Sequence, residues 1–566
     1  MKAGVAASGP AGYHGDMRHI LGGSSRAARV ARAAVAGTAL LPATIAVVPV
    51  VLHAQGASPT TPTLVVLITI DQFRGDYPTR FASQLTGGLG RLVRGGAWGV
   101  NGTQDHANTE TAPGHAATLS GRFPVHTGIA ANAEGVNDRQ SPLIDAPDAG
   151  ASPWRFRGTT LLDWMRAADR RTRFLSVSRK DRGAILPIGR AKGDVYWYSA
   201  TGIFTQSQYY GTSLPRWVRD FNALQQPMKY AGWEWTTLLP DSAYAEPDSV
   251  PSESMGQGVA FPHRIPDDPQ LAAASLAGFP PMDAVTLDFA LAGVRALELG
   301  ADPRRTDLLA ISLSTTDAIG HRWGPDSREL HDQVLRLDRA LGAFLDSLFT
   351  LRDSSRVILA LTADHGVTPL PVEGVVSTVT PNPGARFVEL RPTWRTHIER
   401  MAAAGIDTNR VDFVDGLFIV GDTSSFVKRR LSVDSVANAL LADMRAIPGV
   451  HRAQLLSEIA NADTTTDMIA RRWLHMFAPG GPVRAIVTLD RFCYPAGART
   501  ATHGSPWELD AWVPVLFWGA PFKAGRYEQP VRVVDIAPTL AAVLGVRPAE
   551  PLDGVVLQSM LAAPRP

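Results

Sequence analysis

Four short runs of consecutive apolar residues constrain the fold of this chain more than any other feature. They cover residues 63–70, 307–313, 356–362 and 512–518. A continuous apolar run predicts a strand that is buried on both faces, which is typical of a parallel sheet covered by helices. Between the runs, residues 283–299 and 327–351 carry apolar side chains at helical spacing. This alternation predicts an α/β fold with a doubly wound, mostly parallel sheet and helices on both faces.

Two stretches fit this alternation poorly. Residues 190–280 are rich in Trp, Tyr, Pro and Gly, and residues 385–490 carry their own mixed pattern, with a helical segment over 433–447. We expect both stretches to be insertions that cap or wall the sheet. They would belong to one large domain over residues 57–566.

The first 56 residues do not resemble a folded segment. Arginines over residues 18–32 precede an apolar Ala/Val-rich run over 33–52, and small residues follow it. This order is typical of a secretory signal peptide. A single transmembrane anchor is the alternative, because the run is long enough to span a membrane. Pro42, Pro49 and the small residues at the end of the run favour cleavage, which predicts a periplasmic or secreted protein with no stable membrane anchor.

Charge and cysteine usage exclude other classes of protein. The chain has 55 Lys+Arg and 53 Asp+Glu; loss of residues 1–56 removes five bases and one acid, which leaves 50 and 52, a net charge of −2. A nucleic-acid binder needs a basic surface, so that class is excluded. The single cysteine, Cys493, excludes an intrachain disulfide and a Cys-based zinc cluster. The sequence does not fix the oligomeric state, although we expect a monomer.

Acidic and histidine side chains stand at the predicted strands. In chain order they are Asp71 after the first run, Asp317 and His321 after the second, Asp364 and His365 after the third, and His503 ahead of the fourth. Ligands of open α/β sheets gather at the carboxyl ends of the strands. Carboxylate oxygens and imidazole nitrogens are the ligands of zinc, and three of each are enough for two ions.

Each of these motifs is weak alone, because a single Asp at a strand end is more often a helix cap or a turn residue. Their joint placement at strand ends favours a metal site. Two metals about 4 Å apart can hold the attacking and the leaving oxygen of an in-line phosphoryl transfer.

A hydroxyl group stands at the predicted start of a helix. Pro113 and Gly114 suit a turn into a helix that begins near Thr111. Free backbone N–H groups and the positive end of the helix dipole would stabilise an alkoxide at this position and attract a phosphate. On the residues alone, Thr111 is equally an ordinary helix N-cap, and Thr109 is the alternative nucleophile.

Two basic residues lie in the segment Ser178–Pro187. Lys180 and Arg182 are separated by one residue, so an extended chain would point both side chains to the same side. They could then bind one doubly charged phosphoryl group, Arg as a fork and Lys as a point charge. A solvated basic turn is the ordinary alternative.

These segments together resemble the alkaline phosphatase superfamily over roughly residues 62–560. Within it, the chain is similar to the periplasmic, phosphate-irrepressible alkaline phosphatases, which are related to the type I phosphodiesterase/nucleotide pyrophosphatases. The motifs are LITIDQFRGDY at 67–77, TETAPGHAATLSGRFPVHTGI at 109–129, SRKDRGAILPIG at 178–189, TTDAIGH at 315–321, TADHG at 362–366, THGSPWELDAWVPVLFWG at 502–519 and VDIAPTLAAVLGV at 534–546.

The resemblance implies a fold, a cofactor and a role for each candidate residue. It implies an alkaline-phosphatase-like domain with two zinc ions, one held by Asp317, His321 and His503, the other by Asp71, Asp364, His365 and the Thr111 oxygen. It selects Thr111 as the nucleophile and implies that Asn132 binds a phosphoryl oxygen. The residues after Asn132 are smaller than in relatives, which leaves Asn137 as the alternative. Lys180 and Arg182 match the Lys-x-Arg pair of the monoesterase branch.

The expected function is an exported zinc phosphatase that hydrolyses small phosphate monoesters through a phosphothreonine intermediate. A phosphodiesterase or nucleotide pyrophosphatase on the same site is the first alternative. A sulfatase requires Cys or Ser followed by x-P-x-R, whereas residues 111–115 read Thr-Ala-Pro-Gly-His. The manganese phosphoglycerate mutases of the superfamily are cytosolic, which disagrees with the leader.

A secreted binding module without turnover is the alternative from another class. Aromatic residues between 197 and 217 could line a sugar site in such a module, although packing is the more ordinary role of aromatic side chains. They are Trp197, Tyr198, Tyr209, Tyr210 and Trp217.

Overall fold

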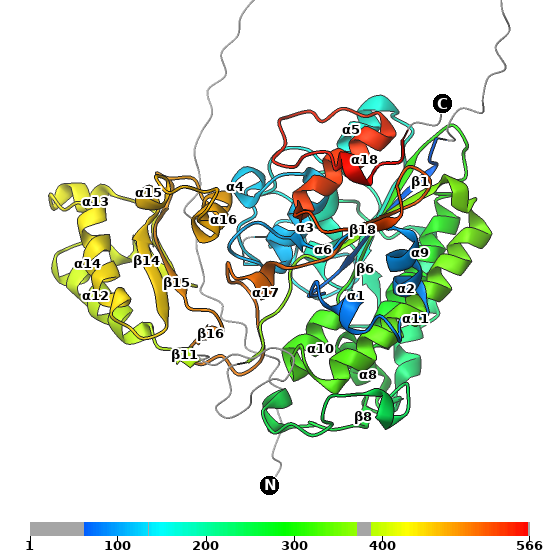
Figure 1. The fold of residues 1–566 in the computed structure, drawn as a ribbon, viewed down its shortest axis with the longest axis horizontal. Helices are drawn as coiled ribbons and strands as arrows, with labels where there is room; N and C mark the ends of the chain where they lie inside the picture. Colours follow the sequence, from blue (N-terminus) through cyan, green and yellow to red (C-terminus); the bar gives the residue numbers. More distant parts are fainter. Residues whose placement is uncertain (1–60, 134, 371–385, 564–566) are drawn as a thin grey trace, which may run out of the picture. The chain divides into compact units, whose positions relative to one another are not determined.

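The computed structural model describes residues 61–133, 135–370 and 386–563 (Figure 1). The predicted signal peptide lies outside these ranges. Within them, the main sheet has nine strands in the order β18-β2-β17-β10-β1-β9-β4-β5-β6. Their bounds are β1 Leu64–Ile70, β2 Ala97–Gly99, β4 Phe174–Ser178, β5 Val195–Tyr198, β6 Phe204–Thr205, β9 Asp307–Leu313, β10 Val357–Thr362, β17 Val515–Trp518 and β18 Gly525–Tyr527.

The centre of the sheet is parallel, as the sequence predicts. β10, β1, β9, β4 and β5 run in one direction, and every residue of β1, β9 and β10 is buried. Helices cover both faces (Figure 1), with α2 Gly88–Gly95, α9 Pro281–Ala296 and α11 Arg328–Leu351 on one and α3 Thr111–Ser120, α5 Leu161–Ala168 and α18 Ile536–Leu544 on the other. The doubly wound α/β fold is therefore confirmed.

The fourth apolar run forms a shorter strand that runs in the opposite direction. β17 is antiparallel to both β10 and β2, and it begins at Val515, directly after Pro514, which has no N–H group for a sheet ladder. An antiparallel strand begins at the edge where its parallel neighbours end. The segment ahead of β17 therefore reaches the same edge as the carboxyl ends of β1, β9 and β10.

The stretch 190–280 begins inside the sheet, because β5 and β6 are its strands. The rest of the stretch packs against α11, where Trp235 Nε1 donates to Asp332 Oδ2 at 2.6 Å and the Tyr244 hydroxyl donates to Asp332 Oδ1 at 2.6 Å. Trp197 and Tyr198 are buried in β5. Of the three remaining candidates, Tyr210 and Trp217 pack against the same core, and the Tyr209 hydroxyl donates to the Arg190 carbonyl oxygen at 2.9 Å.

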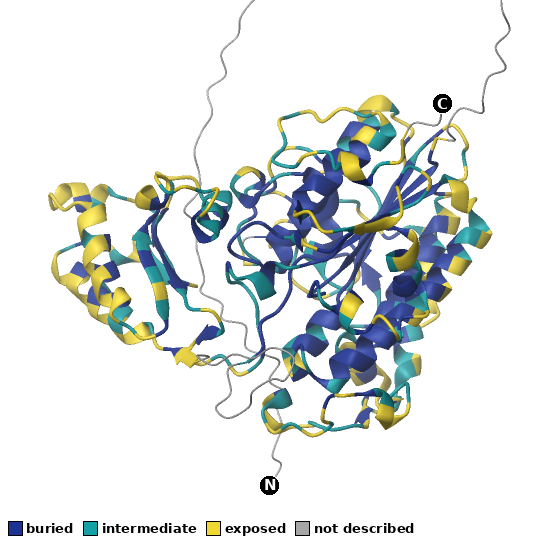
Figure 2. Ribbon diagram, in the orientation of Figure 1, coloured by how far each residue is buried: buried dark blue, intermediate teal, exposed yellow. Residues whose placement is uncertain are grey.

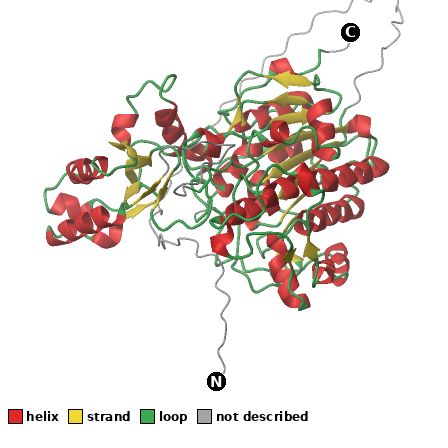
Figure 3. Cartoon of the chain, turned by 60° about the horizontal axis from the view of Figure 1, so that its bottom comes forward, coloured by secondary structure: helices red, strands yellow, loops and turns green. Residues whose placement is uncertain are grey.

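The stretch 385–490 has its own antiparallel sheet and its own core. Within the described residues the strand order is β12-β13-β15-β14, with bounds β12 Val411–Val414, β13 Leu417–Val420, β14 Val450–Leu455 and β15 Val483–Leu489. Figure 3 shows these strands apart from the main sheet. Phe418, Leu440 and Met444 form part of the core beneath α12 Arg391–Ala403 and α14 Val433–Arg445. Figure 2 shows that the outer sides of these helices are exposed.

Two single features complete the description of the fold. Cys493 is buried at the start of β16 Cys493–Pro495. In the ranges that the structure describes, every helix is too short or too polar to cross a bilayer.

Candidate active site

Three strands and one loop bring the candidate metal ligands to one edge of the sheet. Asp71 follows β1, and Asp364 and His365 follow β10. Asp317 and His321 lie one turn apart on α10 Thr315–Trp323, which follows β9. His503 lies in the loop before α17 Glu508–Ala511 and β17. The antiparallel direction of β17 is what brings this loop to the carboxyl ends of the parallel strands.

Three histidines are oriented alike by backbone carbonyl groups. His321 Nδ1 lies 2.7 Å from the Ala501 carbonyl oxygen, His365 Nδ1 lies 2.9 Å from that of Gly366, and His503 Nδ1 lies 2.7 Å from that of Thr109. A carbonyl oxygen can only accept a hydrogen bond, so each Nδ1 must carry a proton. In the neutral rings, each Nε2 is then a lone pair that is available to a metal.

These Nε2 atoms face carboxylate oxygens rather than donors. His365 Nε2 lies 3.5 Å from Asp71 Oδ1 and 3.7 Å from Asp364 Oδ2, and His321 Nε2 lies 3.2 Å from Asp317 Oδ1. His365 Nε2 and Asp71 Oδ1 are buried without a hydrogen-bond partner among the described residues, whereas Asp71 Oδ2 lies 2.7 Å from Lys180 Nζ. A cation between these facing acceptors would relieve their repulsion in a buried site, and the donor types fit zinc.

The ligand atoms form two compact groups that share one residue. Asp317, His321 and His503 form one group, and Asp71, Asp317 and His365 form the other, with the ligand atoms of each within 4.8 Å of one another. The resemblance implies Asp364 rather than Asp317 in the second group. Asp364 Oδ2 instead lies 3.1 Å from His115 Nδ1, while Asp364 Oδ1 accepts hydrogen bonds from the backbone N–H groups of Gln72 and His365.

The electrostatics of the cluster match a site for cations. Burial, followed by the neighbouring Asp317 and Asp364, raises the pKa of Asp71 to about 6. Burial would also raise the pKa of Asp317, but Lys180 and His321 beside it hold that pKa well below its usual range. Burial, with His365 and His321 nearby, lowers the pKa of His503 well below its usual range, which keeps this ring neutral.

Thr111 stands beside the cluster as the first residue of α3. Glu110, not Thr111, is the N-cap of this helix, so the N-cap interpretation of Thr111 is wrong. Thr111 is buried, and Lys180 Nζ donates to its hydroxyl oxygen at 3.3 Å. Lys180 Nζ also lies 2.7 Å from Asp71 Oδ2 and 2.7 Å from Asp317 Oδ2. One ammonium group thus connects the candidate nucleophile to both ligand groups.

Thr109, the alternative nucleophile, uses its polar groups to bind another loop. Its hydroxyl donates to the Ser505 carbonyl oxygen at 3.0 Å and accepts from the Gly504 N–H at 3.2 Å. Its own carbonyl holds His503 Nδ1. Both polar groups of Thr109 therefore bind the loop that carries His503.

The structure separates the two candidate asparagines. Asn132 Oδ1 accepts from the Ala112 N–H at 2.8 Å, which places the amide one residue from Thr111, and the Asn132 N–H donates to Glu110 Oε2 at 2.6 Å. Asn137 is exposed, and its side chain donates to the Ala133 carbonyl oxygen at 3.2 Å.

Lys180 and Arg182 do not lie in one extended segment, so that part of the sequence argument is wrong. Lys180 is extended, with φ −94° and ψ 139°, but it is the N-cap of α6 Asp181–Ile185, and Arg182 is the second residue of that helix. Asp181 favours the helix start, since its Oδ1 accepts from the Arg182 N–H at 2.6 Å. Arg182 Nε is buried without a hydrogen-bond partner in the described part of the chain.

Sequence reasoning missed two residues that contact the ligands. Gln72 donates its N–H to Asp364 Oδ1 at 3.1 Å and its side-chain amide to Asp317 Oδ1 at 3.1 Å. Its φ of 62° is left-handed, and a Cβ at Gly320 would lie 1.9 Å from Gln72 Oε1. Two features of the sequence point to the contacts of Gln72. Gln72 directly follows Asp71, and a glycine, Gly320, lies on the facing helix α10.

His115 is the second missed residue. It is fully buried, with Nδ1 2.9 Å from the Thr111 carbonyl oxygen and 3.1 Å from Asp364 Oδ2, and Nε2 2.9 Å from Ser312 Oγ. The neighbouring Gly114 allows α3 to approach β10, because a Cβ there would lie 2.1 Å from the Asp364 carbonyl oxygen. The signal in the sequence is only the pair Gly114-His115, which follows the candidate nucleophile.

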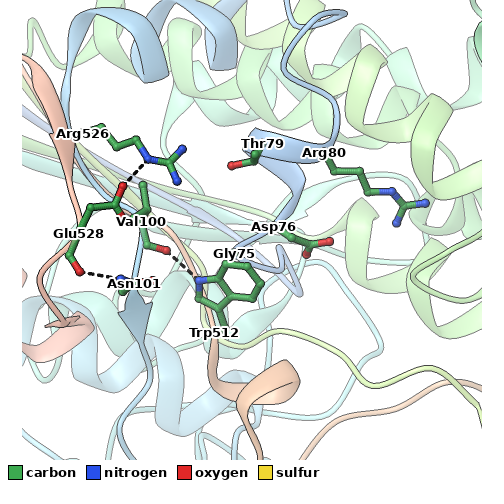
Figure 4. A pocket seen from close by; sticks show the side chains of 9 residues that line it. All are labelled: Gly75, Asp76, Thr79, Arg80, Val100, Asn101, Trp512, Arg526 and Glu528. Atoms are coloured by element: carbon green, nitrogen blue, oxygen red, sulfur yellow. Dashed lines mark hydrogen bonds and ion pairs between the residues drawn. The ribbon is translucent and has the colours of Figure 1, made fainter. Parts of the chain in front are cut away.

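A cavity of about 330 Å³ lies elsewhere at this edge of the sheet (Figure 4). Its walls include Gly75, Thr79, Trp512 and Arg526, and they include none of the candidate ligands. Arg526 Nε is paired with Glu528 Oε1 at 2.8 Å, and Trp512 Nε1 donates to the Val100 carbonyl oxygen at 2.8 Å. Arg80, also in the wall, pairs with Glu246 and Asp326, and the candidate ligands lie outside the cavity.

Comparison with known proteins agrees with this geometry. The family model of type I phosphodiesterase/nucleotide pyrophosphatase matches residues 65–414. Alkaline phosphatase PhoV of Synechococcus elongatus is 31% identical, over 88% of this chain and 93% of its own length. Alkaline phosphatase PhoK of a Sphingomonas species is 32% identical, over 88% of this chain and 92% of its own length.

The fold also matches solved structures. The crystal structure of alkaline phosphatase PafA superimposes with a TM-score of 0.80 at 26% identity, over 90% of this chain and 100% of PafA. A PafA variant, in which a Thr is replaced by Ser and an Asn, a Lys and an Arg are replaced by Ala, matches with the same score. The chain belongs to the type I phosphodiesterase/nucleotide pyrophosphatase family and, within it, to the alkaline phosphatases, which are phosphoric monoester hydrolases.

Proposed function

We propose that this enzyme is an exported, zinc-dependent phosphatase that transfers the phosphoryl group of small monoesters to Thr111 and then to water. The observation that carries the proposal is the convergence of three histidine Nε2 atoms and buried carboxylates beside the Thr111 hydroxyl. Export rests on the predicted signal peptide over residues 1–56.

The donor set supports two zinc ions. Asp317, His321 and His503 would hold one, and Asp71, His365 and Asp364 would hold the other, with Asp317 within reach of both. Bound zinc supplies Lewis acidity to the attacking and the leaving oxygen of an in-line displacement.

Thr111 carries the covalent step. Its hydroxyl gives its proton to solvent and its oxygen forms a bond to phosphorus as the bond from phosphorus to the ester oxygen breaks, and the ester oxygen takes up a proton from solvent and leaves as the alcohol. A second water then attacks the phosphothreonine, which releases inorganic phosphate and restores the hydroxyl. The ammonium group of Lys180, 3.3 Å from Thr111 Oγ1, favours the alkoxide form, and the start of α3 contributes the positive end of a helix dipole.

Three side chains would bind the remaining phosphoryl oxygens, where negative charge accumulates. Asn132 has its amide oxygen committed to the Ala112 N–H, so its NH₂ group is the part that could donate to a phosphoryl oxygen. Arg182 could contribute its guanidinium as a fork, and Lys180 a point charge.

The PafA variant supports these assignments by spacing. Its replaced Thr and Asn lie 21 positions apart, as Thr111 and Asn132 do (132 − 111 = 21), and its Lys and Arg lie two positions apart, as Lys180 and Arg182 do. The four residue types occur in the same order in both chains.

A test of the proposal is the selectivity for monoesters over diesters. For the unmodified enzyme we expect a much higher kcat/KM for an aryl phosphate monoester than for the methyl diester of the same aryl group. Replacing Arg182 by Ala should lower the monoester kcat/KM by about 10–100-fold, since it removes a charged hydrogen bond of about 1.5–3 kcal/mol, and should change the diester value much less. Replacing Lys180 by Ala should lower both values, because Lys180 Nζ also contacts the Thr111 oxygen.

The exposed Lys192, which lies over the ring of Tyr209, offers a matched control. Its replacement by Ala should leave both values unchanged. A diester preference in the unmodified enzyme would instead support a phosphodiesterase on the same ligands, and absence of any turnover would favour a binding module.

A further inference from the structure

Helix α16, Met468–Met476, belongs to the 385–490 stretch, yet several of its polar contacts lie on two loops beside the candidate ligands. Figure 1 shows α16 beside α4 Pro124–Thr127, at the side of the small sheet that is closest to the main domain. The first of these loops, residues 104–110, leads into Thr111, and the second, residues 501–507, carries His503.

Arg472 contacts both loops at once. Its Nη1 donates to the Pro506 carbonyl oxygen at 2.5 Å, and its Nε donates to Asp105 Oδ1 at 3.3 Å. Its own carbonyl oxygen accepts from the Ala107 N–H at 3.1 Å. The side chain is 3% exposed, so these bonds are shielded from water and fix its position.

The two loops that Arg472 joins are also the loops that meet at the site. Thr109 binds Gly504 and Ser505 through its hydroxyl, and it holds His503 Nδ1 through its carbonyl. The orientation of His503 therefore depends on how the two loops are placed against each other, and the Arg472 side chain also bonds both loops.

The neighbours of Arg472 hold only one of the loops. Arg471 Nε pairs with Asp105 Oδ2 at 3.1 Å, but its other contact is the Thr464 carbonyl oxygen on its own segment. His475 Nδ1 donates to the Asp105 carbonyl oxygen at 2.5 Å, and its ring stacks on Phe123 at a centroid distance of 3.7 Å. These contacts dock α16 on the first loop without reaching the second.

We infer that Arg472 is a positioning residue, and that α16 is a brace from the 385–490 stretch that holds His503 and the Thr111 loop in register. This gives the insertion a role in assembling the site. The inference rests on the proposed function, because it treats His503 as a metal ligand.

The test compares Arg472→Lys and Arg472→Ala with Arg471→Ala in the full-length protein. Lysine retains the charge opposite Asp105, but it lacks the fork that reaches Pro506. The readouts are zinc bound per chain at graded concentrations of a chelator, the thermal midpoint, and kcat and KM for an aryl phosphate monoester.

We expect both Arg472 variants to release one zinc ion at a chelator concentration at least 10-fold lower than the unmodified protein requires, with kcat reduced and KM little changed. Arg471→Ala should keep zinc retention and kcat within about 2-fold. Arg472→Lys is the decisive variant if Arg472→Ala fails to fold.

Equal zinc retention in Arg472→Lys, Arg471→Ala and the unmodified protein would overturn the brace. Loss of zinc to the same degree in both Arg471→Ala and Arg472→Lys would overturn it as well, since docking of α16 alone would then explain the effect. An unmodified protein that binds no zinc contradicts the proposed function itself, and that result is visible before any variant is compared.

Discussion

Replacing Thr111 by alanine is expected to lower kcat for phosphate monoesters by about 10⁴-fold or more, because the hydroxyl that receives the phosphoryl group is lost. Among the described residues, the Thr111 hydroxyl takes part only in the hydrogen bond from Lys180, and the three ligand histidines are oriented by the carbonyl groups of other residues. The variant should therefore keep its fold and its bound zinc. Steady-state kinetics together with metal analysis of the same preparation check both expectations.

Two variants separate the nucleophile from its surroundings. Thr111→Ser retains a hydroxyl and should retain most of the activity, whereas Thr109→Val removes the alternative hydroxyl and should still form the phosphoenzyme at Thr111. Near-normal turnover in Thr111→Ala would assign the covalent step to another group. A phosphorylated peptide that contains Thr111, trapped at low pH and identified by mass spectrometry, would support the intermediate directly.

Replacing Asp317 by alanine should lower activity as much as replacing Thr111 by alanine, but for a different reason. Asp317 belongs to both ligand groups, pairs with Lys180 Nζ at 2.7 Å and accepts from Gln72 Nε2 at 3.1 Å. Its loss removes a ligand and leaves the ammonium of Lys180 less compensated in a buried site. We expect zinc content to fall below that of any variant of the other carboxylates, and kcat/KM to fall by about 10⁴-fold or more.

Asp338 is the matched control for loss of a buried carboxylate. It lies on α11, where it accepts from the N–H groups of Gly87 and Gly90, away from the ligands. Asp338→Ala should lower the thermal midpoint and leave the zinc content per folded chain unchanged. Retention of both zinc ions in Asp317→Ala would contradict the shared role of this residue.

The sequence predicts the central strands and the ligands for the same physical reason. Strands such as Leu64–Ile70 are buried on both faces, so their apolar runs are continuous, and the polar residue that ends each run marks the edge where ligands collect. Asp71 and the Asp364–His365 pair follow such runs directly. Their placement at one edge can be predicted without knowing how the side chains pack.

Other features depend on contacts between distant segments. Nothing local in residues 512–518 shows that β17 runs antiparallel, since its direction follows from its partners β10 and β2. The short strands β5 and β6 lack a long apolar run, so the sequence pattern does not distinguish them from the rest of the 190–280 stretch. The roles of Gln72 and His115 became visible only when their partners across the sheet were placed.

The Lys180 and Arg182 pair shows where local reasoning fails. Alternating residues share a side only in an extended chain, but Lys180 is the N-cap of α6 and Arg182 lies within that helix, where its N–H donates to Asp181 Oδ1. The two cations therefore need tertiary packing, not strand geometry, to serve one phosphoryl group. Their selectivity for monoesters is a prediction for the variants described above.

The most direct test of this account is to measure the zinc content of the purified protein together with its kcat/KM for an aryl phosphate monoester, before and after exhaustive chelation and after zinc is restored. The account predicts about two zinc ions per chain, loss of activity with the metal, and recovery when zinc returns. Undiminished monoester hydrolysis by a preparation that contains no metal would contradict it.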